Sequence, residues 1–306
     1  MRIVFMGTPE FAVPCLQAVI DRGDEVAAVY TQPDKPRGRG HKVLPPPVKV
    51  LAEQHGLSVR QPTTLRTAEA AEELGALAPD LIVVVAYGKI LPKEILDIPP
   101  KGCVNVHASL LPQYRGAGPI QWCVLNGETE TGVTTMYMAE GLDTGDMIEA
   151  TQTPIGEDET ADELHDRLSV LGASLLTHTL GLIEAGCAPR TPQPEESSYA
   201  PMLDKSLSGI DFSKDAASVH HQICGLSSWP CAQTMLEGKR LKVYRSHCHP
   251  TRSGKPGEVL DEKRLIVACK TGAVELLEVQ LEGSKRMKAA DFLRGHPVKQ
   301  GTVLGE

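Results

Sequence analysis

The sequence predicts an α/β chain: a doubly wound N-terminal domain with a mostly parallel sheet, followed by a smaller C-terminal β-barrel of OB-like type. Continuous apolar runs such as "DLIVVVAYG" (80–88) are typical of strands that helices cover on both faces. Helical stretches alternate with such runs over the first two hundred residues. Beyond a Pro- and Ser-rich segment, short strands separated by Gly- and Pro-bearing turns replace this alternation.

The N-terminal elements follow in order along the chain. "RIVFM" (2–6) predicts a buried strand, and the next helix is expected to begin with Thr8 as N-cap and Pro9 in its first turn. A strand is expected at 25–31. The later elements are expected as helices near 46–55, 67–77 and 160–185 and as strands in "DLIVVVAYG", "GCVNVHAS", "TGVTTMYMAE" and "GDMIEATQT".

The domain limits follow from composition. "CAPRTPQPEESSYAPML" (187–203) is rich in Pro, Ser and charge, which is typical of a linker. We therefore expect an N-terminal catalytic domain at 1–188, a linker at 189–206 and a C-terminal barrel at 207–306. In the barrel, a helix near 214–225 is expected to precede strands in "RLKVYRS", "GEVL", "RLIVAC" and "AVELLEVQL".

Composition excludes several classes of protein. Of the 306 residues, 41% are hydrophobic and 23% are charged, as in ordinary globular domains rather than disordered chains. No apolar run approaches the ~18 residues that span a bilayer, and no signal peptide is visible, so a cytoplasmic protein is expected. The eight cysteines form no CxxC pair and predict free thiols. "HCH" (247–249) lacks a second pair of ligands, so no metal site is expected.

Charge is unevenly distributed. Residues 1–205 hold 16 Lys and Arg against 28 Asp and Glu, a balance of −12, whereas residues 206–306 hold 15 against 11, a balance of +4. A mildly basic module attached to an acidic one is compatible with a polyanionic partner such as a nucleic acid. Ordinary solvated surfaces would give the same counts, so the charge balance alone leaves both alternatives open.

The stretch "NVHASLLPQYRGAGPI" (105–120) carries the main candidate site. In an extended strand, side chains alternate between faces, so Asn105 and His107 would project together where the strand ends. The small residues at 116–118 would let the backbone approach a ligand closely. The alternative is a hydrogen-bonded buried pair followed by a plain loop that opens a helix.

A second polar cluster, "GLDTGDM" (141–147), offers Asp143 on a Gly-flanked turn, although turn chemistry alone would explain it. Other catalytic motifs fit less well: "MGTPEF" has one Gly instead of GxGxxG, no GxxxxGK[ST] loop is present, and Ser109 is not in a GxSxG elbow. An Asn, a His and an Asp without a nucleophile suit direct transfer of an acyl-type group between two substrates. The Asn would stabilise the oxyanion, the His would move the proton, and the Asp would orient the imidazole or raise its pKa.

These motifs, together with "MGTPEFAVPCL", "TQPDKPRGRGHKVLPPPVKVLA", Trp229–Pro230 and "LKVYR", closely resemble the methionyl-tRNA formyltransferase branch of the folate-dependent formyltransferases over essentially the whole chain. The resemblance implies the catalytic set Asn105, His107 and Asp143. It implies a tetrahydrofolate-binding segment at Ser109, Leu110, Leu111 and Pro112. It implies a tRNA-contacting insertion around Lys35, Arg37, Arg39 and Lys42. Ala108 stands where several relatives have Gly, which we treat as a minor change.

The resemblance implies transfer of the formyl group of 10-formyltetrahydrofolate to the α-amino group of methionyl initiator tRNA in translation initiation. It implies no metal, ATP or nicotinamide, and neither a membrane nor an obligate protein partner. Residues 34–42 carry four cations and one anion, and Pro and Gly there disfavour a helix, so a loop that orders on binding RNA is expected.

Three alternatives stay open from the residues. The acceptor could be a small amine, on a sugar nucleotide or a purine precursor, although such an acceptor needs neither the 31–47 loop nor a basic C-terminal module. Water could replace the amine in a folate hydrolase, which only acceptor binding would distinguish. The chain could be a non-enzymatic RNA-binding protein, although a scaffold would not need the polar trio.

Overall fold

The computed structural model describes residues 1–37 and 42–305, which divide into two compact units. The N-terminal unit comprises Met1–Gly116, Gly132–Thr153 and His165–Tyr199. The C-terminal unit comprises Ala117–Thr131, Pro154–Leu164 and Ala200–Glu306. No single cut of the chain separates the units, because two earlier segments fold with the C-terminal residues. The domain limits given above from composition stay a prediction.

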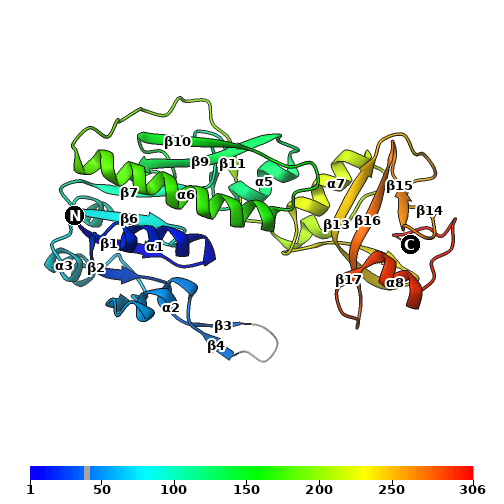
Figure 1. The fold of residues 1–306 in the computed structure, drawn as a ribbon, viewed down its shortest axis with the longest axis horizontal. Coiled ribbons are helices and arrows are strands. Elements are labelled where there is room, and N and C mark those ends of the chain that lie inside the picture. The colour runs from blue at the N-terminus through cyan, green and yellow to red at the C-terminus, as the bar shows by residue number, and fades with distance from the viewer. Residues whose placement is uncertain (38–41, 306) are drawn as a thin grey trace. The chain divides into compact units, whose positions relative to one another are not determined.

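Within the described part of the N-terminal unit, seven strands form one sheet in the order β10-β9-β7-β6-β1-β2-β5 (Figure 1). The pairs β1–β2, β1–β6, β2–β5 and β6–β7 are parallel, and β7–β9 is antiparallel, which confirms the mostly parallel sheet. The strands are β1 (Arg2–Gly7), β2 (Glu25–Tyr30), β5 (Val59–Arg60), β6 (Leu81–Val85), β7 (Cys103–His107), β9 (Glu130–Tyr137) and β10 (Met147–Pro154). The helical elements are η1 (Glu10–Ala12), α1 (Val13–Asp21), α2 (Pro47–Gln54), α3 (Ala68–Ala76), α4 (Lys93–Leu96) and α6 (Ala161–Glu184).

Helices cover both faces of this sheet, because each central strand is apolar on both sides. On one face, Val4 and Ile82 form a buried cluster with Leu74 of α3 and Ile95 of α4. The other face carries α1 and α6, which lie across the strands in Figure 1. Gly172 of α6 lies so close to this face that an added Cβ would stand 3.1 Å from Val106. The doubly wound arrangement is therefore confirmed.

The C-terminal unit is built on an antiparallel sheet in the order β12-β13-β16-β15-β14, with β17 paired to β16. Hydrogen bonds join Leu304 to Gly257 and Gly305 to Met235, so the C-terminal segment connects the two edges of the sheet and gives it a barrel-like form. Val243, Val274 and Phe292 are among its buried core residues. Its elements are α5 (Pro119–Leu125), η2 (Lys205–Ser208), α7 (Ala216–Gly225), β12 (Ala232–Leu236), β13 (Lys239–His249), β14 (Val259–Asp261), β15 (Ile266–Ala268), β16 (Ala273–Leu281), β17 (Met287–Lys288) and α8 (Ala289–Gly295).

Helix α5 packs directly on α7 within the C-terminal unit. Gly225 permits this approach, because an added Cβ would lie 2.7 Å from the Leu125 side chain. Two further short strands are β8 (Arg115–Gly116) and β11 (Tyr199–Ala200), neither of which was expected from the sequence. Their shortness explains this, since two residues show no periodicity.

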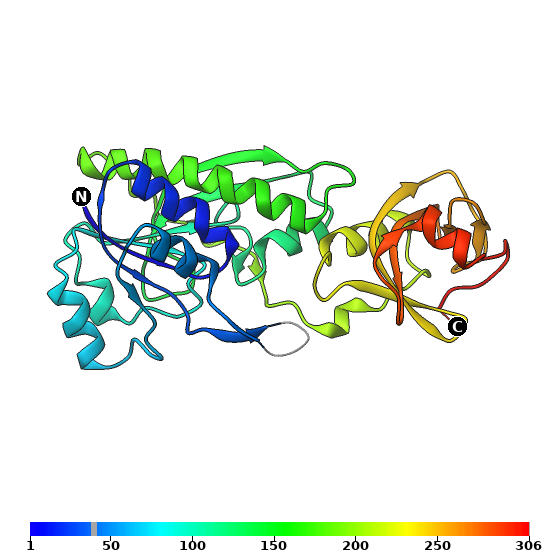
Figure 2. The same ribbon diagram turned by 60° about the horizontal axis from the view of Figure 1, so that its bottom comes forward.

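Two local expectations are wrong. Thr8 does not cap the first helix: residues 10–12 form a 3₁₀ turn, and α1 has Ala12 as its N-cap and Pro14 in its first turn. The Thr8 hydroxyl instead donates a hydrogen bond to the Tyr87 carbonyl over 3.0 Å and accepts one from the Gln32 backbone, which ties three strand ends together. The second is the expected loop at 31–47: its described residues include β3 (Lys35–Arg37) and β4 (Lys42–Leu44), which pair as an antiparallel ribbon that projects from its unit (Figure 2), while ordering on RNA binding stays a prediction.

The cysteines of the described residues are all free, as expected. Burial raises the pKa of the Cys15 and Cys103 thiols to about 12, so neither forms a thiolate at neutral pH. Across the described chain, no helix combines the length and apolar character that crossing a membrane requires.

Candidate active site at the carboxyl edge of the sheet

The parallel strands of the N-terminal unit end at a common edge. Met6 pairs with Tyr30, Gly7 with Val85, and Val84 with Asn105, so β1, β2, β6 and β7 all finish there. Open α/β sheets bind their ligands at this edge, because the loops that leave it are free to carry polar side chains.

Strand β7 brings two of the predicted catalytic residues to this edge on one face. Cys103 belongs to the core beneath α3, whereas Val106 faces Gly172 of α6 on the other side. Asn105 and His107 therefore share the face of Cys103, as the alternation predicted. Both residues are largely enclosed, with exposed fractions of 9% and 6%.

The imidazole of His107 is held by the main chain. Its Nε2 lies 2.9 Å from the carbonyl oxygen of Tyr114. A carbonyl only accepts hydrogen bonds, so Nε2 carries the proton and the neutral ring has its lone pair on Nδ1. Tyr114 adopts a φ of 60° to present this carbonyl, and its own amide donates to the Ser198 hydroxyl over 2.8 Å.

Asp143 lies on the other side of the same ring. Its Oδ2 stands 3.7 Å from Nδ1 of His107, too far for a hydrogen bond but close enough for charge attraction. The same oxygen accepts a hydrogen bond from the Gly116 amide at 2.8 Å. The expectation that Asp143 holds the tautomer is therefore corrected: the Tyr114 carbonyl does so, and the carboxylate faces the nitrogen that would gain a proton.

The turn that carries Asp143 depends on glycine. An added Cβ on Gly145 would lie 1.7 Å from the Tyr137 carbonyl oxygen, so no other residue fits where the turn passes the end of β9. Asp143 itself has a φ of 53°, a left-handed conformation that is uncommon outside glycine.

The side chain of Asn105 makes no hydrogen bond to any residue that the structure describes. Buried amides are usually satisfied within the protein. An amide that is nine-tenths enclosed and still available beside His107 can donate to a bound substrate.

The segment after His107 satisfies its own polar groups. The Ser109 hydroxyl donates to the Gln113 carbonyl over 2.6 Å, and a carbonyl is not a base that could activate it as a nucleophile. Thr134 of β9 donates to the Ser109 carbonyl at 2.7 Å and accepts from the Leu111 amide at 3.1 Å. This leaves Leu110 and Pro112 partly exposed as apolar contacts, while Leu111 is buried.

The predicted basic segment begins at the same edge of the sheet, because it directly follows β2. Lys35 pairs with Leu44 and Arg37 with Lys42 across the ribbon, whereas Arg39 lies outside the described residues. The base of the ribbon is anchored by Asp34, whose carboxylate binds Lys49 at 2.9 Å and Gln61 at 2.6 Å. Hydrogen bonds from Gln61 and Lys49 hold the pKa of that carboxyl below its usual range.

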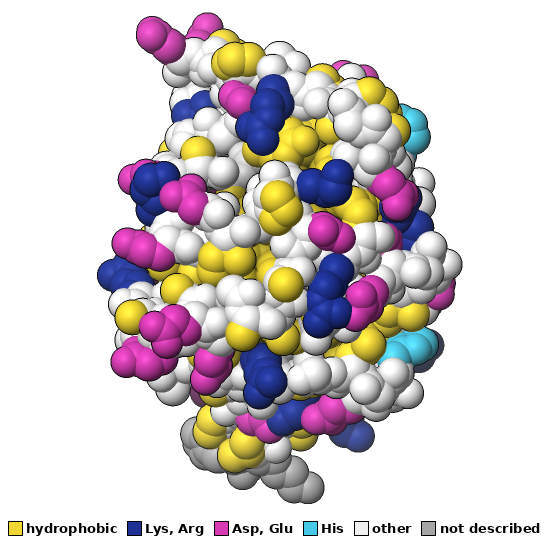
Figure 3. Space-filling view, turned by 90° about the vertical axis from the view of Figure 1, so that its left-hand side faces the viewer, with side chains coloured by type: hydrophobic (Ala, Val, Ile, Leu, Met, Phe, Trp, Pro, Cys, Tyr) yellow, Lys and Arg dark blue, Asp and Glu magenta, His cyan; other side chains and the backbone are white. Residues whose placement is uncertain are grey.

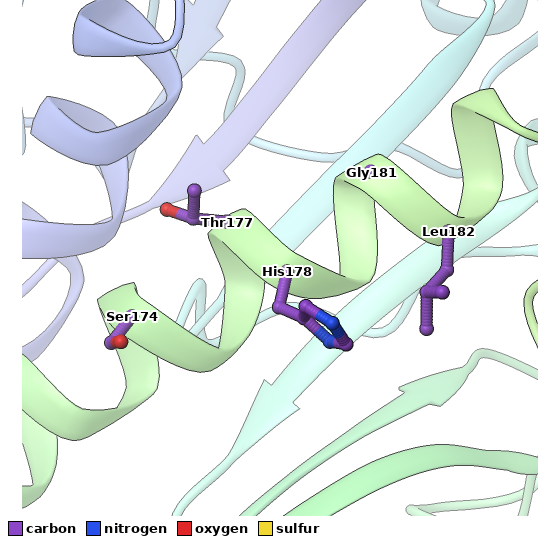
Figure 4. Close-up of a pocket in the computed structure, with 5 residues that line it drawn as sticks. All are labelled: Ser174, Thr177, His178, Gly181 and Leu182. Carbon is purple, nitrogen blue, oxygen red and sulfur yellow. The ribbon is translucent and has the colours of Figure 1, made fainter.

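Other surface features lie apart from this edge. A shallow hollow on α6 is lined by Ser174, Thr177, His178, Gly181 and Leu182 (Figure 4), none of which belongs to the predicted site. Figure 3 shows a face on which Lys and Arg are interspersed with Asp and Glu, without a patch of one sign. Over residues 1–37 and 42–305, no group of His, Cys, Asp and Glu side chains has an arrangement that could hold a metal.

The sequence did not indicate the roles of the Tyr114 carbonyl and the Gly116 amide. Both are backbone groups, and nothing in a residue's identity shows where its backbone will point. The Arg-Gly pair in "QYRGAG" is the only signal that could have directed attention there.

The comparisons with known proteins show the family of the chain. The formyl transferase family pattern matches residues 1–180, and that of the formyl transferase, C-terminal domain, matches residues 202–297. A methionyl-tRNA formyltransferase from Geotalea daltonii is 56% identical over 308 residues, which cover 100% of this chain and 98% of the relative.

Two solved structures share the fold. The first is HypX from Aquifex aeolicus in complex with tetrahydrofolic acid, with 21% identity, a TM-score of 0.66 and coverage of 96% of this chain and 47% of the other. The second is an N-formyltransferase from Helicobacter canadensis in complex with folinic acid and dTDP-3-aminofucose. It has 20% identity and a TM-score of 0.68, and the match covers 90% of this chain and 98% of the other. Identities this low show the fold alone.

Proposed function

The chain belongs to the formyl transferase family, and from that membership we propose that it transfers the formyl group of 10-formyltetrahydrofolate to the α-amino group of methionyl initiator tRNA. One observation carries the proposal: a methionyl-tRNA formyltransferase matches the chain at 56% identity from end to end, through both units. The N-formyltransferase in complex with dTDP-3-aminofucose shares the fold over 90% of this chain but at only 20% identity, so the tRNA acceptor is inferred from the much higher identity to the tRNA enzyme.

The chemistry needs little activation of the acceptor. An α-amino group has a pKa of about 7.7–8.0, so a good fraction is neutral at pH 7 and can attack the formyl carbon. The attack forms a carbon–nitrogen bond and a tetrahedral intermediate with a negative oxygen. We assign the stabilisation of this oxyanion to the Asn105 amide, which has no partner among the described residues.

The proton of the attacking amine is assigned to Nδ1 of His107, since Nε2 is engaged by the Tyr114 carbonyl. The imidazolium formed would face the Asp143 carboxylate, whose Oδ2 is 3.7 Å from Nδ1. The charge of that carboxylate stabilises the protonated ring. His107 then returns the proton to N10 of the folate as the bond from the formyl carbon to N10 breaks, which balances the reaction.

Binding of the donor is assigned to the segment from Ser109 to Pro112. Because its polar groups are bonded within the protein, the contacts that it offers are apolar ones from Leu110 and Pro112. Such contacts suit the ring system of a folate better than its charged tail.

Binding of the acceptor is assigned to the ribbon and to the C-terminal unit. Lys35, Arg37, Arg39 and Lys42 would contact phosphates or the opened acceptor end of the tRNA. Residues 206–306, with a net charge of +4, would add backbone affinity that weakens with salt.

The test is to incubate the protein with 10-formyltetrahydrofolate and methionyl initiator tRNA, and to detect formylmethionine after mild hydrolysis of the ester. Methionyl elongator tRNA and dTDP-3-aminofucose serve as competing acceptors. Formylation of the initiator alone is the expected result. Preference for the sugar nucleotide, or release of free formate without an acceptor, would replace the proposal by one of its alternatives.

A further inference from the structure

Part of the expected linker is bonded firmly to the site. Residues 191–198, here called the strap, run back along the N-terminal unit after α6. Thr191 pairs with Met147 through two backbone hydrogen bonds of 2.8 and 3.0 Å. The Ser198 carbonyl accepts a hydrogen bond from the Arg115 amide at 2.9 Å, and the Ser198 hydroxyl accepts one from the Tyr114 amide at 2.8 Å. One end of the strap is therefore bonded to Met147, the first residue of β10 after the turn of Asp143, and the other end is bonded to the segment whose carbonyl binds His107.

Gln193 joins these two segments through a single side chain. Its Nε2 donates to the carbonyl of Asp143 and to that of Gly145, each at 2.8 Å. Its Oε1 accepts from Nε and Nη2 of Arg115, at 3.0 and 2.7 Å. The carbonyls only accept and the guanidinium only donates, so the amide has one orientation in which all four bonds form.

We propose that Gln193 is a positioning residue of formyl transfer, which acts by holding the Asp143 carboxylate against His107. The inference rests on the proposed function and deepens it. Asp143 occupies a left-handed conformation, which Asp adopts more readily than most non-glycine residues but which still costs free energy unless its surroundings stabilise it. Gln193 supplies this constraint directly, because it binds the carbonyl of Asp143 itself and the carbonyl two residues later.

Arg115 takes part in the same arrangement. Its guanidinium is bonded to Gln193 and, at 3.3 Å, to the hydroxyl of Ser197, so it is committed to the strap. Since Arg115 follows Tyr114 directly, the bond between Arg115 and Gln193 links the groups on both sides of the imidazole. Loss of Gln193 would release the Asp143 turn while leaving the bond between Tyr114 and His107 in place.

The experiment uses the full chain and two substitutions. Q193M keeps the length of the side chain and removes its four bonds to Asp143, Gly145 and Arg115. Q193E keeps the shape but places a carboxylate oxygen against two carbonyls. The matched control is E195Q on the strap, because the Glu195 side chain is exposed and has no hydrogen bond in the described structure. We expect kcat to fall about 10- to 100-fold in Q193M, with the KM values of donor and acceptor nearly unchanged and E195Q equal to wild type.

A double-mutant cycle with D143N separates positioning from a general structural role. If Gln193 acts through Asp143, Q193M costs little further activity in the D143N background. Equal losses in both backgrounds, or full activity of Q193M alone, would overturn the inference. If Q193M does not fold, Q193E replaces it in the same cycle with D143N. A loss of activity by Q193E that is small in the D143N background supports the inference, and equal losses in both backgrounds overturn it. A wild-type protein that does not formylate the tRNA would instead overturn the proposed function.

Discussion

The Nε2 of His107 donates a hydrogen bond to the main-chain carbonyl of Tyr114, seven residues further along the chain, over 2.9 Å. A backbone carbonyl cannot be removed by exchanging a side chain, so this bond sets the proton position of the ring through the fold of the loop. The opposite nitrogen, Nδ1, faces Asp143, at 3.7 Å from the carboxylate. Proton transfer at this site is therefore expected to depend on the ring of His107 and on the geometry of two loops.

We expect His107→Ala to fold normally and to lower turnover by about 10²–10⁴-fold, the loss typical of a missing general base. Formylation of methionyl initiator tRNA under single-turnover conditions measures the effect, because product release does not enter. Thermal unfolding serves as the control. Turnover equal to that of the wild type would remove His107 from the mechanism.

We expect Asn105→Ala to lower kcat by about 10²–10³-fold, as the loss of one oxyanion donor does elsewhere. The free energy of unfolding should change by less than about 1 kcal/mol, because the amide has no hydrogen-bond partner in the described structure. Asn105→Asp is the matched variant, since it keeps the shape but cannot donate. An active Asn105→Asp protein would contradict the role of the amide.

Periodicity was enough to predict which polar residues lie together at the carboxyl edge of the sheet. The alternation in "VNVHA" placed Asn105 and His107 on one face, and the continuous apolar run at 80–88 indicated a covered parallel strand beside them. Asp143 was found because glycines flank it, and Gly145 is indeed required where the turn passes the Tyr137 carbonyl. These features depend on local patterns, which is why the sequence alone reveals them.

The remaining features depend on contacts between distant segments. Thr8 looked like a helix cap, but its hydroxyl binds the Tyr87 carbonyl, a bond that spans 79 positions. Gln193 lies in a Pro- and Ser-rich stretch that is typical of linkers, and its four bonds reach back as far as Arg115. Composition indicates only how a segment behaves on its own, so it could not show that residues 191–198 are held in place by hydrogen bonds to distant segments.

We expect the double substitution Lys35→Ala and Arg37→Ala to raise the KM for the tRNA about tenfold and to leave the KM for the folate unchanged. Each lost phosphate contact should also reduce the slope of log affinity against log salt by about one. Arg39→Ala should act in the same direction. Lys101→Ala is the matched control, because Lys101 precedes β7 at the opposite edge of the sheet. Equal damage to folate binding would place the ribbon in the donor site instead.

The last prediction concerns acid stability of the C-terminal unit. Glu275 is 8% exposed; it accepts hydrogen bonds from His249 at 2.9 Å and from Nε of Arg264 at 3.1 Å. Burial, the largest single influence, raises the pKa of this carboxyl, but the bonds and charges of Arg264 and His249 together outweigh it and leave the pKa below its usual value. A carboxyl whose pKa is lowered in the folded state stabilises the fold when the pH is above its pKa in the unfolded chain, about 4.3. This contribution is lost as the pH falls through the pKa of the folded state.

Glu275→Gln should therefore lower the free energy of unfolding at pH 7 by about 1–2 kcal/mol, a range that allows for solvent screening of the half-exposed Arg264. The difference between the variant and the wild type should shrink below about pH 4. Urea unfolding of both proteins from pH 7 to pH 3, followed by circular dichroism, measures this convergence. Asp291→Asn is the control, because its pairing with Arg294 is exposed on α8 and should contribute little at any pH. A difference that stays constant down to pH 3 would show that packing of the Gln side chain, rather than the charge of Glu275, causes the loss.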